Sequence, residues 1–200
     1  MFFSDAKQDQ FIANLFKFKK DGSYLDIGSC GGIASNNSYA LEKMGWSGVC
    51  IEIDPIHNQT YLARNCKHIN GDALEVDYLE IIESSGLSKE IDYLSLDIDE
   101  KSVDVLDKIP LDKIRFKAIT IEHDYYLYSD LYRKKQREIL IKNGYFLVCG
   151  DVFVEQDGFF GRECPFEDWW ISPEYFDTGL IERLESKMEY PSQILKKFNT

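Results

Sequence analysis

Basic residues are scarce in this chain. Its 23 Lys and Arg stand against 35 Asp and Glu, which gives a formal net charge of −12 at neutral pH. A surface of this sign repels the phosphates of nucleic acids and of anionic membranes. The composition therefore predicts neither nucleic acid nor a membrane as a partner, whereas a cationic ligand is compatible with it.

The sequence also lacks long apolar runs and paired cysteines. No segment approaches the length of a membrane span, and no apolar h-region follows the opening residues MFFSDAKQDQF. The five cysteines are odd in number and scattered, without zinc-ligand spacing, and a disulfide framework is not expected in a chain of this size. We therefore expect a reduced, cytoplasmic protein.

Short apolar runs alternate with helical patterns through most of the chain. The runs lie at residues 24–27, 49–53, 68–70, 93–98, 118–121 and 145–154, with a candidate last strand in PFEDWWI at 165–171. The helical patterns lie at 38–44, 56–65, 78–84, 102–108 and 129–142, and most end at Gly or Pro. This order predicts an α/β fold with a mostly parallel seven-stranded sheet and helices on both faces.

The two ends differ from this pattern. Residues 5–18 predict an amphipathic helix with Phe11, Leu15 and Phe18 on its buried stripe. Residues 180–198 predict one polar helix, or two short ones separated at Pro191. The glycine-flanked stretch 155–163 is interpreted as either a mobile lid or an ordinary connection.

Acidic residues follow nearly every apolar run. They are Asp26, Glu52, Asp72, Asp97, Asp99, Glu100, Glu122, Asp124 and Asp151. Ligands of open α/β sheets bind outside the carboxyl ends of the strands, so these residues predict a site at that edge. The alternative is that these acids have no ligand and occur at strand ends only because strand ends face water, which solvates charged side chains.

The glycines of SYLDIGSCGGI, residues 23–33, do not match a dinucleotide loop. That fingerprint has G-x-G-x-x-G closing on a helix N-terminus, whereas the spacing from Gly28 is G-x-x-G-G and the next helix signal begins near Ser38. Asp26 would stand beside the phosphates without a basic partner. The loop therefore favours a cofactor that carries positive charge and an adenosine, with Glu52 accepting two ribose hydroxyls and Asp72 accepting from the adenine amino group.

These motifs resemble a known family. LDIGSCGGIASNNSYALEKMGWSGVCIEIDP, DYLSLDIDE, ITIEHDYY, NGYFLVCGDV and FEDWWISPE are similar, in this order, to motifs of FkbM-like class I S-adenosylmethionine-dependent methyltransferases. The resemblance covers about residues 24–175 and implies a Rossmann-like fold. It departs from the family at Cys30, Gly31, Ile53 and Glu100.

The resemblance also implies a division of the chain and a cofactor site. We expect a single methyltransferase domain over residues 1–200, with an N-terminal helix (1–20), a cofactor-binding α/β core (22–154) and a lid, last strand and C-terminal helical tail (155–200). The expected contacts to S-adenosylmethionine come from the glycine loop and the strand ends. They are Asp26, Gly28, Ser29, Gly32, Glu52, Ile53, Asp72, Ala73 and Asp97.

Methyl transfer from a sulfonium mainly requires alignment, and a base helps a hydroxyl acceptor. His123, between Glu122 and Asp124, is the favoured base, with Asp97 beside the reacting atoms; the alternative is a structural histidine. In a second scheme, Asp97, Glu122 and Asp124 are oxygen ligands of Mg²⁺, and the ion would lower the pKa of the acceptor hydroxyl.

Two further groups of side chains have alternative interpretations. The aromatics Tyr125, Tyr126, Tyr128, Phe159, Phe160, Trp169 and Trp170 form either an acceptor pocket or core and lid packing. The basic cluster Arg133, Lys134, Lys135 and Arg137 is interpreted mainly as a solvated helix face.

The leading hypothesis is O-methylation of a small molecule or glycan, by a protein that forms either a monomer or a homo-oligomer. Its rivals are a non-catalytic scaffold of the same fold and an NAD(P)-dependent oxidoreductase or epimerase.

Overall fold

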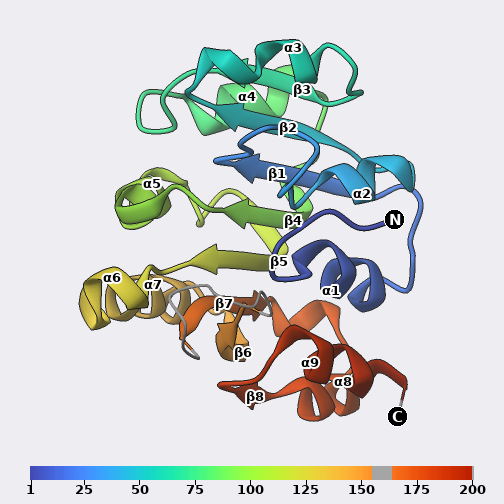
Figure 1. The fold of residues 1–200 in the computed structure, drawn as a ribbon, viewed down its shortest axis with the longest axis vertical. Coiled ribbons are helices and arrows are strands. Elements are labelled where there is room, and N and C mark those ends of the chain that lie inside the picture. Colours follow the sequence, from blue (N-terminus) through green and yellow to red (C-terminus); the bar gives the residue numbers. More distant parts are fainter. Residues whose placement is uncertain (155–163, 200) are drawn as a thin grey trace.

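One twisted sheet organises the molecule. The computed structural model describes residues 1–154 and 164–199, and their strands form a sheet in the order β3-β2-β1-β4-β5-β7-β6-β8 (Figure 1). The strands are β1 (Ser23–Ile27), β2 (Ser47–Glu52), β3 (Lys67–Asn70), β4 (Glu90–Leu96), β5 (Arg115–Glu122), β6 (Phe146–Phe153), β7 (Pro165–Ile171) and β8 (Ser186–Lys187). The first five pair in parallel, and β7 runs antiparallel to both β5 and β6.

The predicted mostly parallel sheet is confirmed, with one strand more than expected. The eighth strand, β8, has two residues, which pair with Cys149 and Gly150 at the edge of the sheet. A pair this short leaves no periodic signal in a sequence, so pattern analysis misses it.

Helices cover both faces of the sheet. They are α1 (Gln8–Leu15), α2 (Tyr39–Lys43), α3 (Asn58–Tyr61), α4 (Tyr78–Ser84), α5 (Ser102–Lys108), α6 (Tyr125–Tyr128), α7 (Asp130–Lys142), α8 (Thr178–Leu184) and α9 (Pro191–Lys196), with short 3₁₀ turns η1 (Pro55–His57), η2 (Asp99–Lys101), η3 (Pro173–Tyr175) and η4 (Lys197–Asn199). No helix of the described residues has both the length and the apolar character that crossing a membrane demands.

Two apolar cores result from the alternation of side chains along the strands. Leu25 and Ile27 of β1 face the core that α4, α5 and α7 cover, whereas Tyr24 faces the core under α1, α2, α8 and α9. Burial on both faces explains why the strands appear as nearly continuous apolar runs.

The N-terminal helix is shorter than the pattern predicted. Lys17 and Phe18 have φ angles of 52° and 55°, which a right-handed helix does not allow, so α1 ends at Leu15. Phe11 and Leu15 are buried as expected, but the prediction for Phe18 was wrong, because its side chain is 55% exposed.

The C-terminal segment contains two short helices, and Pro191 is the first residue of the second. Proline is well tolerated there because the first helical N–H has no partner within the helix. The lid interpretation, and Phe159 and Phe160, lie outside the described residues.

The chain order of the strands sets the place of the site. From β1 the chain moves outward to β2 and β3, then returns to β4 on the other side of β1 and continues to β5. Strand order thus reverses between β1 and β4, where α/β proteins hold ligands at the carboxyl ends of the strands.

Candidate functional site

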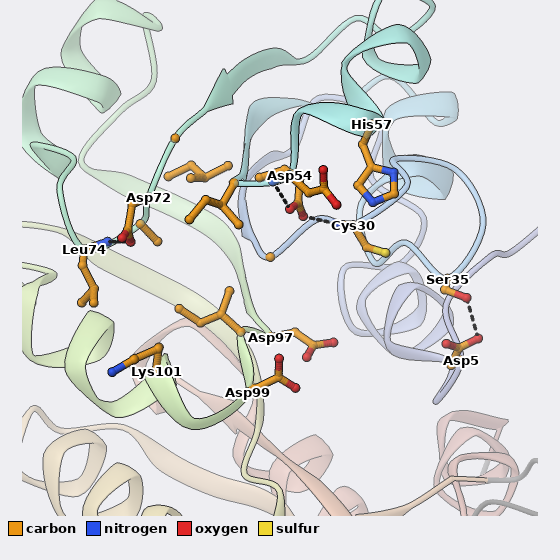
Figure 2. Close-up of a pocket in the computed structure, with 17 residues that line it drawn as sticks. Asp5, Cys30, Ser35, Asp54, His57, Asp72, Leu74, Asp97, Asp99 and Lys101 are labelled. Atoms are coloured by element: carbon orange, nitrogen blue, oxygen red, sulfur yellow. Dashed lines mark hydrogen bonds between the residues drawn. The ribbon is translucent and has the colours of Figure 1, made fainter.

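A cavity of about 650 Å³ opens at this reversal point. Figure 2 shows it between the ends of β1, β2 and β4 and the turn after β3. Its lining residues are Asp5, Gly28, Cys30, Ser35, Ile51, Glu52, Ile53, Asp54, His57, Gly71, Asp72, Ala73, Leu74, Asp97, Ile98, Asp99 and Lys101.

The cavity brings together six of the nine residues predicted to bind a cofactor. Those are Gly28, Glu52, Ile53, Asp72, Ala73 and Asp97. The other three do not line it: Asp26 lies behind the glycine loop, and Ser29 and Gly32 are loop residues that Tyr61 and Arg64 hold from behind.

Gly28 permits a close approach of two strand ends. Its φ is 78°, and a Cβ at this position would lie 1.8 Å from the Asp97 carbonyl oxygen. The Asp97 N–H donates to the Ile27 carbonyl at 3.0 Å, which ties the end of β4 to the end of β1. Only glycine combines this φ with this contact, so the loop and Asp97 are positioned by the same backbone constraint.

Glu52 is fixed by the backbone on both sides of it. The Cys30 N–H donates to its Oε2 at 2.7 Å, and the Asp54 N–H donates to its Oε1 at 2.9 Å (Figure 2). Each carboxylate oxygen has a second lone pair, so Glu52 can still accept two further hydrogen bonds. The carboxylate is therefore preorganised for a pair of donors such as adjacent hydroxyls.

The opposite end of the cavity combines one acid with apolar side chains. Asp72 Oδ1 accepts from the Leu74 N–H at 2.8 Å, which closes a tight turn and orients the carboxylate. Ile53, 63% exposed, and Ala73 line the cavity near it. A flat apolar group with an exocyclic amine fits such an end.

Asp26 acts behind the loop instead of inside the cavity. It is buried, and it accepts from Ser38 Oγ at 2.6 Å and from Asn36 Nδ2 at 3.1 Å. Burial is the main reason why its pKa is raised. Asn36 Nδ2 also donates to the Ser29 carbonyl at 2.8 Å, so Asp26 shapes the loop from beneath.

Arg64 and Tyr61 complete this support. The Arg64 guanidinium pairs with Glu42 at 2.9 Å, with both side chains buried, and donates to the Gly32 carbonyl at 2.8 Å. The Tyr61 hydroxyl lies 2.5 Å from Ser29 Oγ, and its ring packs against Gly32. Sequence analysis missed both residues, because an Arg and a Tyr in an amphipathic stretch carry no signal of burial.

Asp97 and Glu122 lie at the ends of neighbouring strands. They directly follow Leu96 and Ile121, which are paired in the parallel register of β4 and β5. Burial is the main reason why the pKa of both carboxyls is raised, and the charge of Asp97 raises the pKa of Glu122 further. Asp97 borders the cavity, whereas Glu122 is buried and accepts from the Tyr126 hydroxyl at 2.9 Å.

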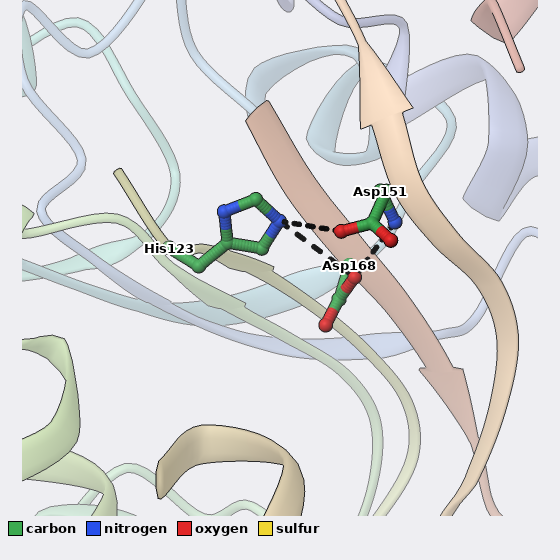
Figure 3. Close-up of side chains that lie close together, drawn as sticks. All are labelled: His123, Asp151 and Asp168. Carbon is green, nitrogen blue, oxygen red and sulfur yellow. Dashed lines mark hydrogen bonds and ion pairs between the residues drawn. The ribbon is translucent and has the colours of Figure 1, made fainter. Parts of the chain in front are cut away.

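His123 does not line the cavity. Its Nδ1 accepts from the Tyr125 N–H at 3.4 Å, and its Nε2 lies 3.8 Å from Asp151 Oδ1 and 3.7 Å from Asp168 Oδ1 (Figure 3). Burial lowers its pKa to about 4, so the ring is neutral at neutral pH. Its role as a catalytic base stays a prediction, and its setting is that of a side chain packed among ion pairs.

The acids beside His123 are paired with arginines from α7. Arg137 binds both oxygens of Asp168 at 2.7 and 2.8 Å and also reaches Asp151, which Arg133 contacts at 2.5 Å. The prediction that this basic cluster is a solvated helix face was therefore wrong for Arg133 and Arg137. Two buried carboxylates draw these guanidinium groups inward, because a buried charge is costly unless it is paired.

This cluster is also where the described residues come nearest to a metal-binding geometry. Candidate ligand atoms of His123, Asp151 and Asp168 lie within 4.8 Å of one another. The two arginines already neutralise both carboxylates, so a cation would have to displace them. Asp97, Glu122 and Asp124, the residues considered for Mg²⁺, do not form a group this tight among the described residues.

Trp169 and Trp170, considered for an acceptor pocket, are core residues. Both are fully buried, and the Trp169 ring stacks on Phe11 with centroids 4.3 Å apart.

Comparison with known proteins identifies the fold. No protein-family model matches the chain, and no curated protein sequence matches it. Among solved structures, a TehB-like SAM-dependent methyltransferase from Corynebacterium glutamicum is similar, with a TM-score of 0.54, 13% identity, and 86% of this chain and 88% of that chain covered. TYW2 from M. jannaschii in complex with AdoMet matches with a TM-score of 0.53 and 13% identity, covering 84% of this chain and 74% of the other. Together with the strand order and the cavity at the β1/β4 reversal, these likenesses give the chain the Rossmann-like fold of class I S-adenosylmethionine-dependent methyltransferases.

Proposed function

We propose that the protein is a methyltransferase that moves a methyl group from S-adenosylmethionine to a hydroxyl of a small molecule or glycan. The observation that carries the proposal is the charge of the cavity. Six carboxylates line it against a single lysine, Lys101: Asp5, Glu52, Asp54, Asp72, Asp97 and Asp99. A pyrophosphate would be repelled there, whereas a cofactor with a sulfonium and an ammonium would be attracted.

Different residues of the cavity would contact different parts of the cofactor. Glu52 would accept the two ribose hydroxyls, Asp72 the adenine amino group, and Ile53 and Ala73 would contact the adenine. The backbone at Gly28 would lie against the methionine part. The ordered strand-end motifs support an FkbM-like relationship within this proposal.

When bound, S-adenosylmethionine supplies a methyl group that is already activated by the sulfonium. The protein then has to align the acceptor and take up a proton as the hydroxyl reacts. Asp97 borders the cavity, and the raised pKa of its carboxyl makes it a better base than an ordinary aspartate. We therefore propose that the Asp97 carboxylate accepts the proton of the acceptor hydroxyl, with Glu122 beside it.

Two variants separate this assignment from the one based on His123. We expect Asp97→Asn to lower kcat about 100-fold, the range of a lost general base. We expect His123→Gln to leave the pH profile of kcat unchanged, because the ring does not line the cavity. A pH-dependent loss confined to His123→Gln would return the role of base to the histidine.

Calorimetry tests the function itself. S-adenosylhomocysteine should bind with a 1:1 stoichiometry, and NAD should not bind. Binding of NAD alone would support the oxidoreductase or epimerase hypothesis, and binding of neither would support a scaffold that keeps the fold. Labelled S-adenosylmethionine supplied with an extract of the native source would then identify the methylated product.

A further inference from the structure

We propose that Asp5 binds the ammonium group of the cofactor's methionine part, and that the N-terminal segment (residues 1–7) thereby forms one wall of the cofactor site. The contact would make the site selective for an adenosine ligand that carries an amine. The inference rests on the proposed function and names the residue that recognises the amino-acid end of the cofactor.

The fold leaves the ammonium without the partner expected for it. Asp26 is buried, accepts hydrogen bonds from Ser38 and Asn36, and does not line the cavity. A primary ammonium has three N–H donors, and its strongest hydrogen bonds are those to a carboxylate. The acid that binds it therefore has to be one that lines the cavity.

Asp5 lines the cavity although it precedes the α/β core in the chain. Its Oδ1 accepts from Ser35 Oγ at 3.1 Å, and Ser35 also lines the cavity, shortly after the glycine loop. Figure 2 shows Asp5 and Ser35 across the cavity from Asp72 and Leu74. Since Asp72 is assigned to the adenine, Asp5 lies at the end where the methionine part is expected.

The turn that carries Asp5 is held on both sides. Before it, Ser4 Oγ donates to Asp9 Oδ1 at 2.6 Å and accepts from the Asp9 N–H at 3.1 Å. After it, the Ala6 N–H donates to Gln8 Oε1 at 3.1 Å. The Asp5 carboxylate is therefore presented to the cavity from a preorganised turn, which reduces the entropy lost when a ligand binds.

Two elements of the core hold the segment in place. Gln8 Nε2 donates to Glu167 Oε2 on β7 at 3.0 Å, and both side chains are buried. The Phe3 ring packs edge-on against Tyr39, the first residue of α2, with centroids 4.9 Å apart. The position of the segment thus depends on contacts that do not involve the Asp5 side chain.

The chemistry of Asp5 suits an ammonium group. A carboxylate can accept about four hydrogen bonds, so the contact with Ser35 does not exhaust the capacity of the Asp5 oxygens. Hydrogen bonds between two charged groups are roughly twice as strong as those between neutral ones. A ligand without the amine would lose this contact and keep those of its adenosine.

Calorimetry with two ligands tests the inference. S-adenosylhomocysteine carries the ammonium but no sulfonium, and methylthioadenosine keeps the adenosine but lacks the amino-acid part. We expect Asp5→Asn to raise the Kd of S-adenosylhomocysteine about tenfold. The Kd of methylthioadenosine should stay within about twofold of wild type, because the asparagine oxygen can still accept from Ser35.

A deaminated analogue of S-adenosylhomocysteine provides the second measurement. Wild type should bind this analogue about tenfold more weakly than S-adenosylhomocysteine. Asp5→Asn should bind the two ligands with nearly equal affinity, because the contact that distinguishes them is already lost. Asp112→Asn removes the same charge from an exposed residue outside the cavity, and this matched control should change none of the Kd values.

Three results would overturn the inference alone. One is an equal loss of both ligands in Asp5→Asn, together with a lower urea midpoint, which would make Asp5 a structural residue. The second is an unchanged Kd of S-adenosylhomocysteine in this variant. The third is a raised KM for the acceptor with that Kd unchanged, which would assign Asp5 to the acceptor. Failure of wild type to bind S-adenosylhomocysteine would overturn the proposed function, and the inference with it.

Discussion

Gly28→Ala should lower the free energy of unfolding by about 3 kcal/mol or more and should weaken cofactor binding. The added Cβ would lie 1.8 Å from the Asp97 carbonyl oxygen, and an alanine would be strained at a φ of 78° in any case. Relief requires the ends of β1 and β4 to separate, which moves Asp97 away from the cavity. Urea unfolding measures the stability, and calorimetry with S-adenosylhomocysteine measures the binding.

Gly86→Ala is a matched control for the backbone conformation. Gly86 has a φ of 70°, but a Cβ there would meet no atom within 4 Å. Only the left-handed conformation is penalised, so we expect a loss of about 1 kcal/mol and normal binding. Equal losses in the two variants would mean that the contact between Gly28 and Asp97 is not a rigid one.

Glu52→Ala should weaken the binding of S-adenosylhomocysteine about 1000-fold, or about 4 kcal/mol. Hydrogen bonds to a charged acceptor contribute about 1.5–3 kcal/mol each, and two ribose hydroxyls would lose theirs. The substitution also leaves the N–H groups of Cys30 and Asp54 without their acceptor, which loosens the loop. Titration calorimetry gives the ratio of the two Kd values.

Glu52→Gln separates the two contributions to that loss. The amide keeps one oxygen acceptor, so we expect an effect between those of wild type and Glu52→Ala. Glu182→Ala serves as the surface control. If Glu52→Ala binds S-adenosylhomocysteine as tightly as wild type does, the cofactor does not use this carboxylate, and the orientation assigned to it in the cavity is wrong.

The sequence carried strong signals where local rules and burial agree. The predicted helices at residues 78–84 and 102–108 have the observed bounds, because Asp77 caps the first by accepting from two backbone N–H groups and Pro110 follows the second. The strand-end acids Glu52, Asp72 and Asp97 do line one cavity, because parallel strands all present their carboxyl ends on one edge.

Other features depend on contacts between distant parts of the chain. His123 follows β5, whereas Asp151 and Asp168 lie on β6 and β7, and only the antiparallel pairing of β7 with both neighbours brings them together. No spacing rule within the sequence indicates that these three side chains lie close together. The assignment of Asp26 to the cavity placed the acid on the right strand, but the buried amide of Asn36 and hydroxyl of Ser38 turn it into the support layer.

The buried pair of Arg64 and Glu42 has a consequence for how ligands enter and leave. Arg64 donates to the Gly32 carbonyl, so lifting the glycine loop would take this acceptor away from a buried guanidinium that Glu42 holds in the interior. We therefore expect that side of the cavity to stay closed. We expect ligand exchange to proceed past Ile53, Leu74 and Lys101, which line the cavity with exposed or half-buried side chains.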